Sequence, residues 1–463
     1  MKEENKKYAE EAYEIVSDAA LKIGSRLPGS EGEKKFHRYM QDKLEAIGIT
    51  PKEEEFAVSP RSGIGGLPYA GWAGAIVSIG AIIAFSINSL WYLLGAFSLI
   101  AIFWLITSCF LYRTWFDMFF PQKISRNSYG VLEPEDGKAD YTIILSGHTD
   151  TSWTWRHSEH IYKYRDNPII GVIITYIKVG FGAVCFFLIT LFSAFMGVVQ
   201  LLTDMANANM FAAEGTVGTL AQKMAAFNSH PVFNGILVVM HFVPVITAIG
   251  CCFVIMWNDP HEENASRGAM DNATGIALSY EVLKYFKENP EKAPKNCRIV
   301  ALNVGSEESG LRGSMAFADE HKNDELTKNA WNINIDSVAD KDYFEVVIKD
   351  DWQGCRFDTD LEKMFKDTFN ELEIPSKSKD HCIHNPVGGC DSTPMTRAGI
   401  KSVTFAAQNP MLTYYYHTWR DLPDRFETET VGNGFDVVLG VIDKIAKFQE
   451  ENGYNGPRKK AAK

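Results

Sequence analysis

The hydrophobic pattern of the chain is dominated by long segments without charged residues. Ser62 to Tyr112 contains no Asp, Glu, Lys or Arg and is rich in Ile, Leu, Phe and Trp. One crossing of a bilayer needs about 20 apolar residues. The segment is therefore long enough for two membrane spans, near 70–88 and 91–112, with a turn at Asn88-Ser89.

Two further charge-free segments lie between the polar parts of the chain. They cover Val179 to Thr203 and Met224 to Asn258, the second being apolar mainly from Val232 to Trp257. Helices buried in a soluble core usually keep one polar face, and these segments have almost none. They predict a third and a fourth span. The stretch between them carries Asp204, Glu214 and Lys223 and is expected to form an interfacial helix.

The basic residues predict how these spans are oriented. Both insertions return to the side from which they start, so the polar parts of the chain share one side of the membrane. That side has six basic residues near span ends: Lys52, Arg61, Arg113, Lys163, Arg165 and Arg267. The other side has only Lys223. Because cytoplasmic loops carry the excess of Lys and Arg, we expect a multi-pass integral membrane protein whose polar part is cytoplasmic. The first 60 residues show no apolar signal-peptide core.

The polar part of the chain alternates between two periodicities. Helical patterns cover Glu3–Ile23, Glu31–Ile47, Thr274–Lys287, Leu361–Leu372 and Thr430–Glu451. Short apolar runs typical of strands cover Asn127–Leu132, Tyr141–Ser146, Arg298–Val304, Trp331–Ile335 and Ser402–Ala406. This alternation predicts an α/β fold with a mixed, mainly parallel central sheet flanked by helices.

Removing the apolar insertions divides the chain into five segments. The predicted polar domain comprises 1–62, 113–168 and 259–463, and the predicted transmembrane hairpins, with four spans in all, are 63–112 and 169–258. Both hairpins leave from the same region of the sheet. We therefore expect the membrane bundle to lie beside the site formed at the strand ends.

Charge and cysteine content exclude several classes of protein. The chain has 46 Lys+Arg against 58 Asp+Glu, a formal net charge of −12, which argues against broad binding of nucleic acid. Eight cysteines without a CxxC pair fit neither a disulfide framework nor a zinc ribbon. Cys382 and Cys390 are close enough in sequence to form a disulfide, which would contradict a cytoplasmic location.

Acidic residues and histidines cluster directly after the predicted strands or at the start of a helix. They are His148, Asp150, Asp271, Glu307, Glu308, Asp336 and His417. Each has an ordinary explanation on its own, such as a helix N-cap for Asp271. Together, at the carboxyl ends of strands, they suit two divalent metals that share a bridging carboxylate, with one further carboxylate left free to accept a proton.

Six motifs resemble one family. They are HTD (148–150), DNATG (271–275), EESGLRGS (307–314), NID (334–336), GCDSTPM (389–395) and YHTWRDLPDRF (416–426). In combination they resemble the co-catalytic di-zinc exopeptidases, which include leucyl aminopeptidases, aminopeptidase Y and glutamate carboxypeptidases. The opening region, residues 24–49, is also similar. The resemblance covers nearly all of the polar part and neither hairpin, and it implies a zinc-peptidase-like α/β/α sandwich.

The resemblance also implies metal ligands. His148 and Asp336 would hold the first zinc, Glu308 and His417 the second, and Asp271 would bridge both. Mn or Co could replace zinc in such a donor set.

Three other acidic residues receive roles from the same resemblance. Glu307 would be the general base, and Asp150 would hold the His148 ring in the required tautomer. Asp391 falls where the family has a structural acid near the substrate.

The implied function is a membrane-embedded zinc exopeptidase that acts on peptides, most simply an aminopeptidase. Three alternatives stay open: a carboxypeptidase, a single-zinc acyltransferase like the glutaminyl cyclases, and a non-catalytic membrane receptor or scaffold. The expected partners are a peptide substrate and the lipid bilayer, and not nucleic acid. Neither the substrate nor the oligomeric state follows from the sequence.

The remaining polar and aromatic residues near the motifs have weaker patterns. His157, His160, His261, His381 and His384 lack ligand spacing and are predicted to be loop residues rather than a third metal site. Residues 381–389 are expected to form a rim of the substrate pocket. Trp153, Trp155 and Tyr414–Tyr416 either line that pocket or pack beneath it.

Overall fold

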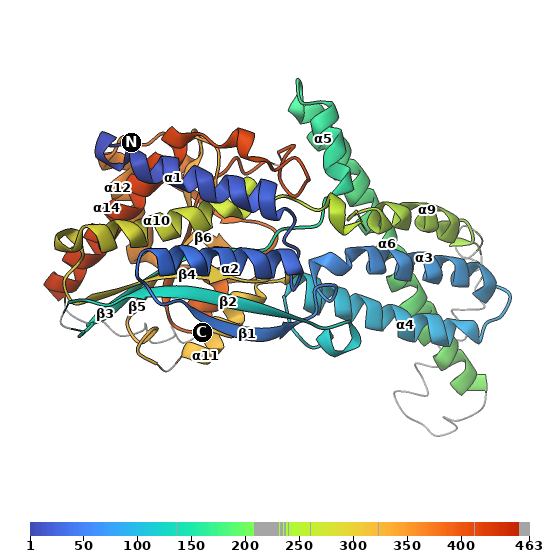
Figure 1. The fold of residues 1–463 in the computed structure, drawn as a ribbon. Helices are drawn as coiled ribbons and strands as arrows, with labels where there is room; N and C mark the ends of the chain where they lie inside the picture. The colour runs from blue at the N-terminus through green and yellow to red at the C-terminus, as the bar shows by residue number, and fades with distance from the viewer. Residues whose placement is uncertain are drawn as a thin grey trace.

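The protein has two structurally different parts. The computed structural model describes residues 1–452 except 136, 208–230, 232–234, 236, 237, 239, 260, 323 and 412. Figure 1 shows a twisted sheet covered by helices, from one end of which a bundle of long apolar helices projects. The polar segments form the first part and the charge-free segments form the second.

The sheet has nine strands in the part of the chain that the structure describes. Its order is β1-β2-β4-β3-β5-β9-β6-β7, with β8 beside β6. The strands are β1 (Lys52–Val58), β2 (Lys123–Leu132), β3 (Tyr141–His148), β4 (Cys297–Val304), β5 (Ala330–Val338), β6 (Phe344–Asp350), β7 (Cys355–Arg356), β8 (Cys382–Asn385) and β9 (Lys401–Ala407).

The strand directions correct one expectation. The centre of the sheet, β4-β3-β5-β9, is parallel, but β1, β2, β6 and β7 extend it through antiparallel pairings. The sheet is therefore mixed, as predicted, and mainly parallel only at its centre. The antiparallel strand β1 is rich in Glu and was not expected, because it lies at an edge where side chains face water.

Helices cover both faces of the sheet. Alternation along β3 directs Ile143 and Leu145 into the larger core and Ile144 into the smaller core. The larger core is built with α1 (Lys6–Ser17), α2 (Glu31–Ala46), α10 (Thr274–Glu288), α12 (Thr359–Glu371) and α14 (Thr428–Asn452). The smaller core contains residues of α11 (Arg312–His321) and α13 (Ser392–Arg397), two short helices that the sequence did not predict. The result is an α/β/α sandwich.

The bundle consists of α3 (Leu67–Ala84), α4 (Leu90–Trp104), α6 (Pro168–Asn207) and α9 (Val243–Ile255). Within the described residues, three helical segments are long and apolar enough to cross a membrane: Ile64–Ala84, Leu90–Phe110 and Pro168–Met205. Four spans were predicted. The described helix of the fourth, α9, is too short to qualify, and part of the predicted Val232–Trp257 span lies outside the described residues. The predicted interfacial helix falls mostly on 208–230, also outside them.

Helix α6 begins earlier than the third charge-free segment predicted. Lys178, the residue that marked the predicted start, lies within the helix and its Nζ contacts His160 Nε2 at 2.7 Å. A single charge with a polar partner does not end an apolar helix, so α6 extends back to Pro168.

Small residues allow the bundle helices to approach closely. A Cβ placed on Gly95 of α4 would lie 3.2 Å from Cα of Gly197 in α6. The hydroxyl groups of Ser78 in α3 and Thr247 in α9 form a hydrogen bond of 2.9 Å. Both features are typical of helices packed in lipid. The outer surface of the bundle exposes many large apolar side chains, which is consistent with membrane association.

Candidate metal centre

The site residues converge at the carboxyl ends of three neighbouring strands. His148 ends β3, Glu307 and Glu308 follow β4, and Asp336 lies near the end of β5. Because β4, β3 and β5 are adjacent and parallel, their ends meet at one edge. Asp271, before α10, and His417, in the loop after β9, complete the group.

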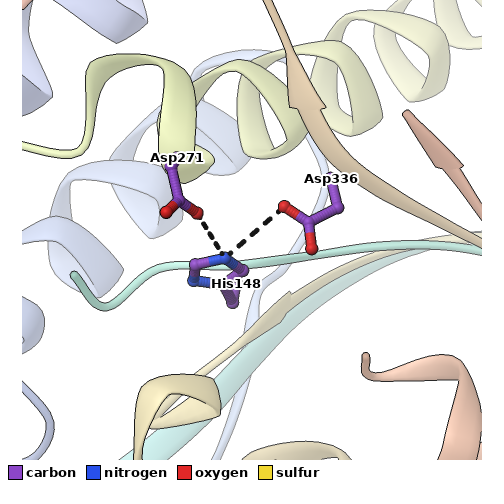
Figure 2. Close-up of side chains that lie close together, drawn as sticks. All are labelled: His148, Asp271 and Asp336. Atoms are coloured by element: carbon purple, nitrogen blue, oxygen red, sulfur yellow. Dashed lines mark hydrogen bonds and ion pairs between the residues drawn. The ribbon is translucent and has the colours of Figure 1, made fainter. Parts of the chain in front are cut away.

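The first set of potential ligands is His148, Asp271 and Asp336. Figure 2 shows both carboxylates directed at the imidazole. His148 Nε2 lies 3.1 Å from Asp271 Oδ1 and 3.7 Å from Asp336 Oδ1. His148 and Asp271 are buried, and Asp336 is partly exposed.

The second set is Asp271, Glu308 and His417, all buried. His417 Nε2 lies 3.1 Å from Asp271 Oδ2 and 3.1 Å from Glu308 Oε1. The two oxygens of Asp271 therefore face different histidines. The structure brings together all five residues predicted as ligands.

The donor set fits zinc. Each of the two sets offers one imidazole nitrogen and two carboxylate oxygens, and the ligand atoms of each set lie within 4.8 Å of one another. Three protein ligands with a position left open are typical of catalytic zinc sites. A further sign is that Glu308 Oε1 and His417 Nδ1 are buried but accept or donate no well-formed hydrogen bond within the described part of the chain.

Asp271 is held by a tightly packed backbone. Its N–H and that of Met270 donate to the Asp421 carboxylate at 3.0 and 2.8 Å. Asn272 donates from Nδ2 to the carbonyl of Ile335 at 2.8 Å, which ties the loop to β5. At Gly275 a Cβ would lie 2.2 Å from that same carbonyl, so only glycine fits there. The DNATG motif thus serves to place Asp271 against the end of β5.

Asp150 differs in part from its expected role. The Nδ1 atom of His148 lies 3.1 Å from the backbone carbonyl of Asp150 and 3.6 Å from its carboxylate. The carboxylate instead accepts hydrogen bonds from the N–H groups of Glu307 and Glu308, at 2.9 and 3.0 Å. Asp150 therefore positions the turn that carries the two glutamates and also contacts the ring of His148.

The electrostatics of the site reflect its crowded carboxylates. Burial raises the pKa of Glu307 well above its ordinary range; His148 opposes this rise, and the carboxylates of Glu308, Asp391 and Asp336 add to it. Burial lowers the pKa of His417, but Glu308 and Asp271 outweigh this effect and raise it to about 10. A cluster of this composition attracts cations.

Asp391 lies in the same buried region. Burial raises its pKa to about 7; His148 opposes this rise, and Asp336 and Asp150 add to it. Asp391 belongs to neither set of potential ligands in the described residues.

Two acidic residues of the site were not predicted. Asp421 anchors the Asp271 loop, and Glu33 of α2 accepts hydrogen bonds from Ser306 N–H and Oγ at 2.7 and 3.1 Å. Ser30 and Glu33 do form a capping-box pattern, which marks a helix start. Nothing in that pattern indicates that the carboxylate also reaches the turn after β4.

Two of the five histidines predicted as loop residues lie in regular elements instead, His160 in the short helix α5 (Glu159–Lys163) and His384 in β8. All five make contacts outside the two sets of potential ligands. His157 Nε2 donates to the carbonyl of Phe253 at 2.8 Å, and His381 Nδ1 contacts that of Phe344 at 2.9 Å. His160 contacts Lys178, His261 lies near Glu263, and His384 lies near Asp351.

The apolar bundle lies beside the site, as we expected. Trp257, just beyond the end of α9, packs edge to face on Trp155 at 5.4 Å between centroids, and Trp155 packs on His417 at 4.3 Å. Tyr416 stacks on His417 at 3.8 Å between centroids and also meets Trp155 edge to face at 5.8 Å. Of the aromatic residues expected near the pocket, Trp155 and Tyr416 therefore pack directly around a potential ligand.

Comparisons with known proteins agree with this site. Residues 249–442 match the family model described as Peptidase family M28; this range includes Asp271, Glu308, Asp336 and His417. The chain is 26% identical over 198 residues to Aminopeptidase YwaD of Bacillus subtilis (strain 168), covering 40% of this chain and 39% of the relative. It is also 26% identical over 187 residues to Endoplasmic reticulum metallopeptidase 1 of Mus musculus, covering 39% and 19%. The chain thus matches well under half the length of these relatives.

The fold is shared with a solved zinc aminopeptidase from Bacillus subtilis, BSAP. The TM-score is 0.51 at 13% identity, with coverage of 94% of this chain and 95% of that chain. The chain thus combines the fold of this solved structure with two candidate sets of metal ligands. Residues 249–442 are thus similar to Peptidase family M28.

Proposed function

We propose that the protein is a zinc-dependent exopeptidase, specifically an aminopeptidase that removes N-terminal residues from peptides. The observation that carries this proposal is the shared carboxylate: Asp271 offers one oxygen to each of two histidines. That arrangement supports two zinc ions, the first with His148 and Asp336 and the second with Glu308 and His417. Zinc held there would polarise the peptide carbonyl and make a water acidic enough to ionise near neutral pH.

Glu307 has the position and the chemistry of the general base. It precedes a potential ligand, belongs to neither set, and is only partly buried. It would take a proton from the attacking water while the water oxygen bonds to the carbonyl carbon. When the C–N bond breaks, Glu307 would return that proton to the departing amine.

We also propose that the bundle is embedded in the membrane and that segments 63–112 and 169–258 are its hairpins. The apolar outer surface and small-residue packing of the helices support embedding, and the distribution of Lys and Arg supports a cytoplasmic peptidase part, 1–62, 113–168 and 259–463. A Glu320→Cys variant places a thiol on the exposed end of α11. It should react with a membrane-impermeant maleimide only after cells are permeabilised. Labelling of intact cells would show that the peptidase part lies on the opposite side of the membrane.

The function is tested by assaying detergent-purified protein on amino-acid arylamides and on N-blocked peptides, with metal analysis of the same sample. We expect two zinc equivalents per chain and cleavage of free-amine substrates only. Cleavage of N-blocked peptides from the carboxyl end would make it a carboxypeptidase. One zinc with cyclisation of N-terminal glutamine would make it an acyltransferase. No turnover on either panel with a loaded site would favour a receptor or scaffold.

A further inference from the structure

Both ends of the first apolar hairpin touch the turn that carries Glu307 and Glu308. At the entrance, a Cβ on Gly63 would lie 2.9 Å from the carbonyl oxygen of Ser309. At the exit, a Cβ on Gly310 would lie 3.1 Å from Cδ1 of Tyr112. The hairpin is therefore in direct contact with the turn that carries the proposed base.

The backbone of Tyr112 is fixed at this point. It adopts a positive φ of 54°, which a tyrosine takes only when its surroundings enforce it. Its carbonyl accepts a hydrogen bond at 3.0 Å from Arg312, a buried residue at the start of α11. Arg312 also donates to Asp117 at 3.2 Å, and Asp117 accepts from Ser62 at the hairpin entrance. This network determines where the tyrosine ring lies.

The ring of Tyr112 occupies the space between the catalytic turn and the predicted pocket rim, 381–389. The side chain is 3% exposed. A Cβ on Gly388 would lie 3.2 Å from its hydroxyl oxygen, and one on Gly389 would lie 3.2 Å from Cε2. The phenol lies in the electrostatic field of Glu307. The absence of side chains at both glycines leaves room for the hydroxyl.

The hydroxyl of Tyr112 makes no hydrogen bond to any residue that the structure describes. Buried tyrosine hydroxyls usually find a partner, because an unpaired one costs about 1–3 kcal/mol. Here the ring packs against Gly310, in the turn that carries the proposed general base. A donor so placed is available to a bound molecule.

We propose that Tyr112 is a substrate-contacting residue, whose hydroxyl donates a hydrogen bond to a main-chain carbonyl oxygen of the bound peptide. The inference rests on the proposed peptidase function and adds a residue from outside the family motifs. It makes the first hairpin part of the peptide-binding site as well as a membrane anchor.

The test uses Tyr112→Phe, which removes only the hydroxyl, beside Tyr69→Phe, the same change on the exposed face of α3. Since the hydroxyl has no hydrogen-bond partner among the described residues, Tyr112→Phe should keep its zinc content and melting temperature. A neutral hydrogen bond is worth about 0.5–1.5 kcal/mol, so kcat/KM on peptides should fall about 2- to 10-fold. Tyr69→Phe should match the parent.

Binding is measured separately in a Glu307→Gln background, with an intact dipeptide and with an analogue in which a CH₂–NH group replaces the peptide bond. Tyr112→Phe should weaken binding of the dipeptide about 2- to 10-fold and leave the affinity for the analogue unchanged. Equal affinity for the dipeptide with and without the hydroxyl, together with unchanged kcat/KM, would overturn the inference while the peptidase function stands. If the parent hydrolyses no peptide, the proposed function fails and this inference fails with it.

Tyr112→Met provides a second variant that fills the space without a hydroxyl. It should reproduce the loss seen with phenylalanine. If it keeps full dipeptide affinity while folded and zinc-loaded, the hydroxyl has no role in binding.

Discussion

The N–H of Trp155 donates a hydrogen bond to the carbonyl of His417 at 2.8 Å, and the indole meets the imidazole edge to face at 4.3 Å. Trp155 also packs against Trp257, two residues beyond the end of the apolar helix α9, and the N–H of Arg156 donates to the carbonyl of Trp257 at 3.0 Å. A potential metal ligand is thus positioned through one intermediate residue by the end of a bundle helix.

Replacing Trp257 should therefore weaken metal binding without touching a ligand. Trp257→Ala removes the surface that supports Trp155, and groups behind metal ligands typically contribute 10- to 100-fold to affinity. Because Trp257 acts through Trp155, we expect about tenfold weaker binding of one zinc ion per chain. The measurement is zinc retention during dialysis against a graded chelator. Trp257→Phe should retain most of the affinity, and Trp115→Ala, at an exposed position, should retain all of it.

Glu307→Gln should separate chemistry from metal binding. The amide cannot accept the proton from water, and general base catalysis contributes about 10²- to 10⁴-fold. We expect kcat to fall by at least about 10³-fold while zinc content stays at the parental value. Glu320→Gln, an exposed glutamate on α11, is the matched control. A Glu307→Gln enzyme with more than a tenth of parental kcat would assign the base elsewhere.

Asp150→Ala should disturb the catalytic turn as well as His148. It leaves the N–H groups of Glu307 and Glu308 without their buried acceptor, at a cost of about 1–3 kcal/mol for each. We expect a lower melting temperature and lower zinc affinity together. Asp150→Asn keeps an acceptor oxygen and should lose less of both. Loss of activity with stability and zinc affinity unchanged would contradict this structural role.

Removing metal should destabilise the protein. The site gathers buried carboxylates, and a ligand that binds only the folded state stabilises it by about 4 kcal/mol at a thousandfold excess over its Kd. Chelator-treated protein should melt several degrees lower in a thermal scan, and zinc should restore the original midpoint. Magnesium should restore less, because it prefers all-oxygen coordination. A melting temperature indifferent to chelation would argue against bound metal.

The buried carboxyl group of Glu281, in α10, should make the free energy of unfolding depend on pH. Burial raises its pKa from 4.5 to about 8, although Lys284 lies 3.7 Å away and opposes the shift. Between pH 4.5 and 8 the folded protein retains a proton that the unfolded chain releases, so this residue costs stability progressively as pH rises through that window. Glu281→Gln should match the parent near pH 4.5 and be more stable by about 1–3 kcal/mol at pH 8.5. Glu10→Gln, on the exposed side of α1, should show no such difference.

The sequence predicted which potential ligands come together better than it predicted the contacts that hold them. His148, Asp271, Glu308, Asp336 and His417 stand beside apolar strands or helix starts, where periodicity and motif spacing are informative. Glu33 and Tyr112 contact the same turn across long separations in the chain. Those contacts exist only once the sheet and the bundle have packed, so no local pattern reveals them.

The same distinction applies to the fold. Strands β3, β4 and β5 are buried along nearly their whole length and were predicted within a few residues. The edge strand β1 carries three consecutive glutamates, and the antiparallel edge around β6 depends on pairing with β9. Their formation follows from tertiary pairing rather than from hydrophobic periodicity.

Helix α6 is longer than any bilayer requires. Its apolar stretch of 38 residues would measure about 57 Å, against a hydrocarbon thickness of about 30 Å. Figure 1 shows it running obliquely past α3, α4 and α9. The tilt of such a helix depends on bilayer thickness. Shortly before α6, Glu159 forms a bidentate ion pair with Arg420, which lies in the same loop as His417. In the membrane-embedded enzyme that we propose, lipid chain length would therefore act on the loop that carries His417, a dependence that a peptidase dissolved in water would not have.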